Sequence, residues 1–214
     1  MTAAIDCYEQ GIRAQATGGD AGWRLRTDAG RTLRPQFTRW CADLFPGDGR
    51  LLDGCTGPTI DMGCGPGRLV SALTGRGVPA LGVDVAAEAV RQCISRGGSA
   101  IQRDFFGRLP GEGRWEHALL ADGNVGIGGD PLAVLRRARR LVRPGGRLHV
   151  ETCAPGTGMR MLSMRFERGR QQSDWFAWAL AGADVVCDLA APTGLRVCAV
   201  WTEDGRWFVV LDAT

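Results

Sequence analysis

The chain contains no lysine, so each of its 26 basic residues is an arginine. We interpret this absence as codon bias in a GC-rich genome, which says little about function. The formal net charge of +3 is too small to indicate a nucleic-acid partner by itself. We therefore expect no nucleic-acid partner from charge alone.

A long apolar segment is also missing. No part of the sequence approaches the roughly 20 apolar residues that span a membrane. Residues 1–17 are interrupted by Asp6, Glu9 and Arg13, which is not the pattern of a secretory signal. The apolar fraction of 44% and the charged fraction of 23% are typical of a soluble globular protein. We expect a cytoplasmic protein with no membrane partner.

The eight cysteines never form a Cys-x-x-Cys pair, and only His117 and His149 could complement them. Their spacing assembles no zinc site, so we expect no metal and reduced thiols. His149 lies inside a predicted strand, where we expect a hydrogen-bonded core residue more than a catalytic base. His117 begins the preceding strand, at the sheet edge away from a ligand.

The central part of the sequence alternates strand and helix signals, which predicts a parallel sheet covered by helices on both faces. Helices are predicted at 68–74 and 87–96, and a third begins at Asp130-Pro131 and ends at Pro144. Residues 195–203 and 206–211 form two β-rich runs joined by Asp204-Gly205, a strong hairpin signal. The strands are predicted at 59–62, 80–83, 100–103, 117–121 and 147–151.

Two segments lie outside this core. Residues 23–34 predict a hairpin that turns at residues 28–30, followed by a helix at 36–45. Residues 159–168 and 175–180 predict a strand pair, followed by a helix at 184–191. We expect both segments to fold over the carboxyl edge of the sheet, where open α/β sheets bind ligands.

The most informative motif is the glycine-rich run that follows the first strand. Its glycines, Gly63, Gly65 and Gly67, allow a sharp turn and a close approach of a ligand to the backbone. The dinucleotide fingerprint would require a third glycine where Arg68 stands. Asp61 directly precedes the glycines, so the site suits an ammonium group better than a pyrophosphate.

Two further acids end the next two strands. Asp84 follows the second strand, where a carboxylate can accept both hydroxyls of a ribose. Asp104 and Phe105 follow the third strand, where an acid and an apolar ring could meet an adenine. Simpler roles stay open, because Asp84 could cap the next helix and Asp104 could belong to a surface turn. Asp61 could likewise cap a turn.

These motifs, in this order, resemble those of class I S-adenosylmethionine-dependent methyltransferases. The resemblance covers residues 57–151, which include the stretch Leu141-Val142-Arg143-Pro144-Gly145-Gly146. It implies a Rossmann-like, seven-stranded, mostly parallel sheet with a C-terminal antiparallel hairpin and helices on both faces. The stretch 119–130 also resembles a short stand-alone actinobacterial branch of this family.

The resemblance assigns S-adenosylmethionine as the cofactor and gives residues their roles. Asp61 and the backbone of Gly63 would hold the methionine amino group, and Asp84 the ribose. Asp104 would bind the adenine amino group, with Phe105 beside the ring. The full predicted cofactor set is Asp61, Gly63, Cys64, Gly65, Gly67, Asp84, Val85, Asp104, Phe105 and Asp122.

The chain is accordingly expected to form one methyltransferase domain over residues 1–214. Residues 1–56 would form an N-terminal cap and 57–151 the cofactor-binding core. Residues 152–194 would form an acceptor-side insertion, and 195–214 the terminal hairpin. Tyr8 resembles the tyrosine that many relatives fold over the cofactor.

The ends of the fourth and fifth strands are the expected acceptor side, and we predict Asp122, Asn124 and Glu151 as catalytic residues. Asp122 or Glu151 could accept a proton from the acceptor. Motifs of nucleobase methylation, Asn-Pro-Pro-Tyr and Pro-Cys, are missing. The arginine run at 136–143 fits the solvent-exposed face of an amphipathic helix better than an RNA-binding site.

We therefore expect methylation of a small molecule, in specialised metabolism. Two alternatives stay open. The protein could be a cyclase or lyase that acts on S-adenosylmethionine itself, or a non-catalytic, cofactor-binding partner of a larger enzyme. The sequence does not predict an oligomeric state.

Overall fold

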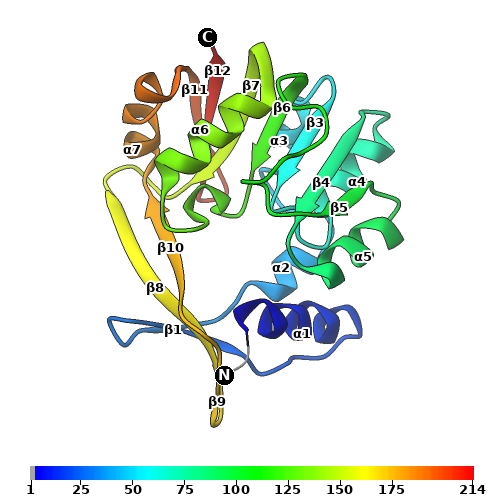
Figure 1. The fold of residues 1–214 in the computed structure, drawn as a ribbon, viewed down its shortest axis with the longest axis vertical. Helices are drawn as coiled ribbons and strands as arrows, with labels where there is room; N and C mark the ends of the chain where they lie inside the picture. The colour runs from blue at the N-terminus through cyan, green and yellow to red at the C-terminus, as the bar shows by residue number, and fades with distance from the viewer. Residues whose placement is uncertain (1–2) are drawn as a thin grey trace.

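The computed structural model describes residues 3–214, which form two β-sheets (Figure 1). The larger sheet has seven strands in the order β11-β12-β7-β6-β3-β4-β5. Strands β3 to β7 run parallel, whereas β12 runs antiparallel to both β7 and β11. This is the predicted mostly parallel sheet with a terminal hairpin. Its strands are β3 Thr59–Met62, β4 Ala80–Asp84, β5 Ala100–Gln102, β6 Trp115–Leu120, β7 Val142–Thr152, β11 Leu195–Glu203 and β12 Arg206–Ala213.

Helices cover both faces of the large sheet, as predicted. Because side chains alternate along a strand, Ile60 and Met62 face one side and Asp61 the other. Ile60 and Met62 belong to the main core, which α6 and α7 cover. Leu119 and Phe208 belong to a second core cluster, beneath α3 and α4. The helices are α3 Asp48–Asp53, α4 Arg68–Gly75, α5 Ala87–Ser95, α6 Pro131–Leu141 and α7 Ala183–Asp188, with short 3₁₀ turns at Asn124–Gly126 and Ala191–Thr193.

The start of α6 follows from its sequence. The side chain of Asp130 accepts a hydrogen bond from the backbone N–H of Ala133 at 3.0 Å, and Pro131 is the first helical residue. The cap satisfies one of the free backbone N–H groups of the first helical turn. Proline has no backbone N–H, so it leaves no donor unpaired at this position. The predicted helix start is confirmed.

The second sheet lies beyond the carboxyl ends of the parallel strands, next to α1 (Ala4–Ala16) and α2 (Phe37–Cys41) (Figure 1). The predicted hairpin and the predicted strand pair are both present, and β1 pairs with β8 to join them into one sheet. Trp23, Phe37 and Phe166 pack this sheet against α1 and α2. The strands are β1 Arg24–Thr27, β2 Thr32–Leu33, β8 Met159–Arg168, β9 Gln171–Gln172 and β10 Phe176–Ala181.

Several predicted boundaries are wrong. The helix predicted at 36–45 ends at Cys41, where Ala42 turns to an extended conformation with a ψ of −178°. Pro46 then disfavours a helical conformation of Phe45, and Gly47 adopts a φ of +90°. A new helix, α3, begins after this break. Helix α6 ends at Leu141, three residues before Pro144, and β7 begins at once. Helix α7 ends at Asp188, short of the predicted 191. Among residues 3–214, no helix combines the length and apolar character needed to cross a membrane.

Candidate functional site

The glycine turn joins β3 to α4 at the carboxyl edge of the large sheet. Gly63 and Gly67 have φ values of +78° and +84°, which residues with a Cβ rarely adopt. A Cβ on Gly67 would also lie 2.3 Å from the Sγ of Cys93, and one on Gly63 would lie 2.7 Å from the Nδ2 of Asn124. The glycines are therefore required by backbone conformation and by close packing.

Asp61 lies beside this turn and is only 2% exposed. Its Oδ1 is buried and has no hydrogen-bond partner among residues 3–214. Burial raises the pKa of this carboxyl to about 7, and the nearby Arg68 offsets only part of the effect. A buried carboxylate without a partner is costly, which makes Asp61 a binding point for a cationic group.

We predict that the affinity for S-adenosylhomocysteine will fall as the pH is lowered. A folded-state pKa of about 7, raised from 3.8, means that the stability linked to Asp61 is full at low pH and is lost as pH rises through 7. Binding of an ammonium requires the ionised form. Affinity should therefore drop about tenfold from pH 8 to pH 6, the ratio of the ionised fractions. Calorimetry measures this drop.

The matched control is Asp104→Asn, which should keep the same pH profile. Asp61→Asn should bind more weakly at pH 8 and show no pH dependence over this range. A wild-type profile in Asp61→Asn would contradict the role of this carboxyl.

Asp84 ends β4 and makes two hydrogen bonds to the backbone. Its Oδ2 accepts from the N–H of Gly65 at 2.9 Å, and its Oδ1 accepts from the N–H of Ala86 at 2.9 Å. Asp84 thus caps the turn into α5 and also anchors the glycine turn. The side chain is 9% exposed, and burial raises its pKa.

The adenine-side residues predicted from the sequence lie in different environments. Asp104 is exposed, and its Oδ1 accepts from the N–H of Phe106 at 2.9 Å. Phe105 is only 5% exposed and packs in the core beneath α6, whereas Phe106 is 41% exposed. The two rings lie 4.7 Å apart between centroids. The open apolar surface at this position is therefore provided by Phe106.

Arg137 holds the segment that carries these phenylalanines. The side chain is buried, its Nε donates to the carbonyl oxygen of Phe105 at 2.6 Å, and its Nη2 donates to Glu112 at 2.7 Å. The hydrogen bond from Arg137 lowers the pKa of Glu112 to about 2. The sequence predicts that the arginine run lies on the solvent-exposed face of the helix. This prediction is wrong for Arg137, which is buried against the segment that carries Phe105.

The remaining predicted cofactor residues lie around the glycine turn. Val85, directly after Asp84, is 51% exposed. Cys64 is buried and packs with Val70 and Cys93 behind the turn. Tyr8 of α1 reaches the front of the turn, because a Cβ on Gly65 would lie 3.2 Å from its hydroxyl oxygen.

The predicted acceptor side contains a closed ring of six alternating charges. Arg68 contacts Asp48, and its Nη2 lies 2.6 Å from Asp122. The Nη2 of Arg39 lies 2.8 Å from Asp122 and 2.7 Å from Glu151. Arg206 completes the ring, 2.8 Å from both Glu151 and Asp48. The members of this ring, in order, are Asp48, Arg68, Asp122, Arg39, Glu151 and Arg206.

The arginines of the ring lower the pKa of Asp48 and of Glu151. Burial acts to raise the pKa of Glu151, but Arg206 and Arg39 outweigh it and lower this pKa to about 2. Glu151 also accepts the backbone N–H of Asp122 at 2.7 Å, where the chain adopts an unusual φ of +54°. Asp122 and Glu151 are thus brought together, as expected for neighbouring strand ends.

Asn124 connects the acceptor side to the glycine turn. Its Nδ2 donates to the carbonyl oxygens of Met62 at 3.0 Å and Gly63 at 2.8 Å. These bonds occupy carbonyls at the end of β3 and hold the turn in place.

The structure brings three potential metal ligands within 4.8 Å of one another, namely Cys55, His117 and His149. The spacing of residues in the sequence does not reveal this cluster. The Nε2 of His117 accepts from the N–H of Thr56 at 3.2 Å, so its Nδ1 must carry the proton that lies between the two histidines. A metal on that Nδ1 would require the opposite tautomer. The histidines form a buried hydrogen-bonded pair, as predicted for His149.

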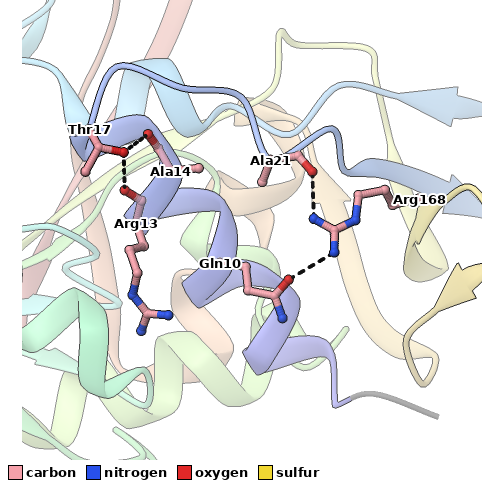
Figure 2. Close-up of a pocket in the computed structure, with 6 residues that line it drawn as sticks. All are labelled: Gln10, Arg13, Ala14, Thr17, Ala21 and Arg168. Atoms are coloured by element: carbon pink, nitrogen blue, oxygen red, sulfur yellow. Dashed lines mark hydrogen bonds between the residues drawn. The ribbon is translucent and has the colours of Figure 1, made fainter.

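A hollow of about 450 Å³ is lined by residues of α1, by Ala21 and by Arg168 of β8 (Figure 2). Arg168 at its rim donates to the carbonyl oxygen of Ala21 at 2.9 Å and to Gln10 at 3.4 Å. These bonds hold the guanidinium in the wall of the hollow. We assign no ligand to it.

The fold is that of class I methyltransferases. The family model of the methionine biosynthesis protein MetW matches residues 50–110, which carry the glycine turn and Asp84. No curated protein matches the chain.

Solved structures share the fold at low sequence identity. An S-adenosylmethionine-dependent methyltransferase from Bacteroides fragilis, in complex with S-adenosylhomocysteine, has a TM-score of 0.82 and 17% identity, over 100% of this chain and 97% of that one. The 1,6-didemethyltoxoflavin-N1-methyltransferase of Burkholderia thailandensis has a TM-score of 0.59 and 15% identity, over 78% and 76%. A sugar N-methyltransferase from Streptoalloteichus has a TM-score of 0.58 and 14% identity, over 77% and 84%.

Proposed function

We propose that the protein binds S-adenosylmethionine and transfers its methyl group to a small-molecule acceptor. The observation that carries this proposal is the buried, unpartnered Oδ1 of Asp61 beside a turn whose glycines have positive φ values and leave little room for a Cβ. Asp61 and the backbone of Gly63 would hold the methionine ammonium. Asp84 would accept the ribose hydroxyls while it keeps its bonds to the backbone.

For the adenine we propose Asp104 as the hydrogen-bond acceptor. Phe105 supports the site from the core, and the exposed ring of Phe106 offers the apolar contact. Val85 and Cys64 complete the wall around the cofactor. The bound cofactor supplies a methyl group that a positive sulfur already activates.

The residues on the acceptor side then have to hold and align a nucleophile. Alignment of this kind can lower the activation barrier by about 7–11 kcal/mol. We propose that Asp122 and Glu151 position arginines, in place of the proton-accepting role expected from the sequence, because arginines already pair with both carboxylates. Asn124 keeps the glycine turn aligned with this side.

A small acceptor is favoured over a macromolecule. Two of the solved neighbours are, by name, a 1,6-didemethyltoxoflavin-N1-methyltransferase and a sugar N-methyltransferase. The second sheet and α2 lie over the carboxyl edge, and we propose that 152–194 is an acceptor-side insertion of a single domain. All eight cysteines are free, which fits our placement of the protein in the cytosol and its acceptor in specialised metabolism.

The proposal predicts that S-adenosylhomocysteine binds in the micromolar range and raises the melting temperature, whereas NAD does neither. At about 100-fold excess over its dissociation constant, the product should stabilise the fold by about 2.7 kcal/mol. Calorimetry and melting curves measure both ligands. Binding of NAD without binding of S-adenosylhomocysteine would overturn the assignment.

A second measurement separates the alternatives. Labelled S-adenosylmethionine is incubated with a metabolite panel, and products are followed by mass. Release of methylthioadenosine without an acceptor would identify a cyclase or lyase. Cofactor binding without turnover across the panel would favour a non-catalytic partner protein.

A further inference from the structure

Two of the three arginines in the charge ring direct both of their terminal nitrogens at acids of the ring. Arg68 is 3% exposed and directs its two terminal nitrogens at Asp48 and Asp122. Arg206 directs Nε and Nη2 at Glu151 and Nη1 at Asp48. Both terminal nitrogens of each side chain are thus engaged in the ring, and the two side chains are only 3% and 10% exposed.

Arg39 differs from both. Only its Nη2 takes part in the ring, where it contacts Asp122 and Glu151. Its Nε is buried without a partner, and its Nη1 makes no hydrogen bond within the described part of the chain. The side chain is also 24% exposed, the highest value among the three arginines. A guanidinium has five N–H donors, and the unengaged Nη1 of Arg39 suits an oxygen-bearing, anionic ligand.

Most ionisable groups around this site are poor proton acceptors. Asp122 and Glu151 each form ion pairs with two arginines, although the Oδ1 of Asp122 makes no hydrogen bond, and the pKa of Glu151 is held near 2. Burial lowers the pKa of His149 to about 3, and the ring of His149 is bonded to His117. Burial raises the pKa of Tyr8 well above its usual value, so it stays protonated. A nucleophile that arrives already ionised requires none of these groups.

An apolar face lies near the same site. Leu162 of β8 pairs with Trp178 of β10, and both side chains are half-buried. They lie on the same face as Phe166, which packs against α2, the helix that carries Arg39. Trp178 also bridges to Ile127, in the loop that follows Asp122. This face offers contact to an apolar or aromatic body.

We propose that the acceptor is a small carboxylate with an apolar body, held through Arg39 and methylated on its oxygen. This inference rests on the proposed methyl transfer. The carboxylate oxygen supplies the electron pair of the new O–C bond, the C–S pair stays on sulfur, and no proton is removed. The ester product is neutral and loses its ion pair with Arg39, which favours its release.

The test uses benzoate, benzamide and methyl benzoate as probes, titrated calorimetrically into the protein with and without saturating S-adenosylhomocysteine. Benzoate should bind at least about tenfold more tightly than either neutral probe, as expected for a charge-assisted hydrogen bond. Arg39→Gln should lower benzoate affinity by a similar factor, and Arg39→Lys should restore part of it. Arg143→Gln, at an exposed arginine paired only with Glu116, should change nothing.

Arg39→Gln should still fold, because Asp122 keeps Arg68 and Glu151 keeps Arg206; a melting curve checks this. Equal binding of benzoate and benzamide, or unchanged benzoate binding in Arg39→Gln, would overturn the proposal. So would a loss of S-adenosylhomocysteine affinity without loss of methylthioadenosine affinity, since Arg39 would then hold the carboxylate of the cofactor. Wild-type protein that binds benzoate but no S-adenosylhomocysteine would retain the anion site and refute the proposed function instead.

Discussion

Replacing Arg68 with methionine should lower the free energy of unfolding by about 3–5 kcal/mol, the range found when one partner of a buried ion pair is removed. The Arg68 side chain is 3% exposed, and Asp48 is fully buried against it. Burial acts to raise the pKa of Asp48, but Arg68 and Arg206 outweigh it. Without Arg68, two carboxylates would each depend on one remaining arginine. Urea unfolding followed by circular dichroism measures the change.

Arg76→Met is the matched control on the same side of the sheet. Arg76 pairs with Asp53 at 2.8 Å, but the Asp53 side chain is 73% exposed. A solvent-exposed pair of this kind should contribute less than about 1 kcal/mol. Equal losses in the two variants would show that burial of the charge ring has no special energetic weight.

Asp84→Ala should lower the affinity for S-adenosylhomocysteine by at least about tenfold, because a charge-assisted hydrogen bond contributes about 1.5–3 kcal/mol. The variant removes the proposed ribose acceptor and also releases the N–H groups of Gly65 and Ala86. The cofactor would therefore lose a direct contact and a preformed turn. Calorimetry at pH 8 measures the affinity.

Asp84→Asn separates these two effects. The amide keeps one oxygen for a backbone N–H but loses the charge, so its affinity should lie between those of wild type and alanine. A melting curve should show that both variants remain folded. Wild-type affinity in Asp84→Ala would place the ribose elsewhere.

The cofactor side was predictable because its signals are local in sequence. Strand β3 occupies the predicted residues 59–62, and α6 begins at the predicted Asp130 cap. The acids at the ends of β3 and β4 follow from the strand pattern alone. Glycine spacing also identified a turn whose φ values are positive. The actinobacterial subtype and the individual site roles stay predictions.

The acceptor side was predictable only in part, because its contacts are distant in sequence. Asp122 and Glu151 could be located as strand ends, but nothing in their spacing points to Arg39 or Arg206 as partners. Periodicity also placed Arg137 on a helix face without revealing that the residue turns inward. The order of strands in the second sheet, where β1 joins β8, likewise depends on tertiary pairing.

The hydrogen bond between Asp48 and Arg206 spans 158 positions of the chain. Contacts of such long range close large loops at a cost in chain entropy, so we expect them to form late in folding. The charge ring cannot close until the β11–β12 hairpin has docked on β7. Asp61, Gly65 and Asp84, by contrast, lie within one strand-helix-strand unit and can come together early. S-adenosylmethionine would bind the unit that contains Asp61, Gly65 and Asp84. It would therefore stabilise the folding chain before the charge ring has formed.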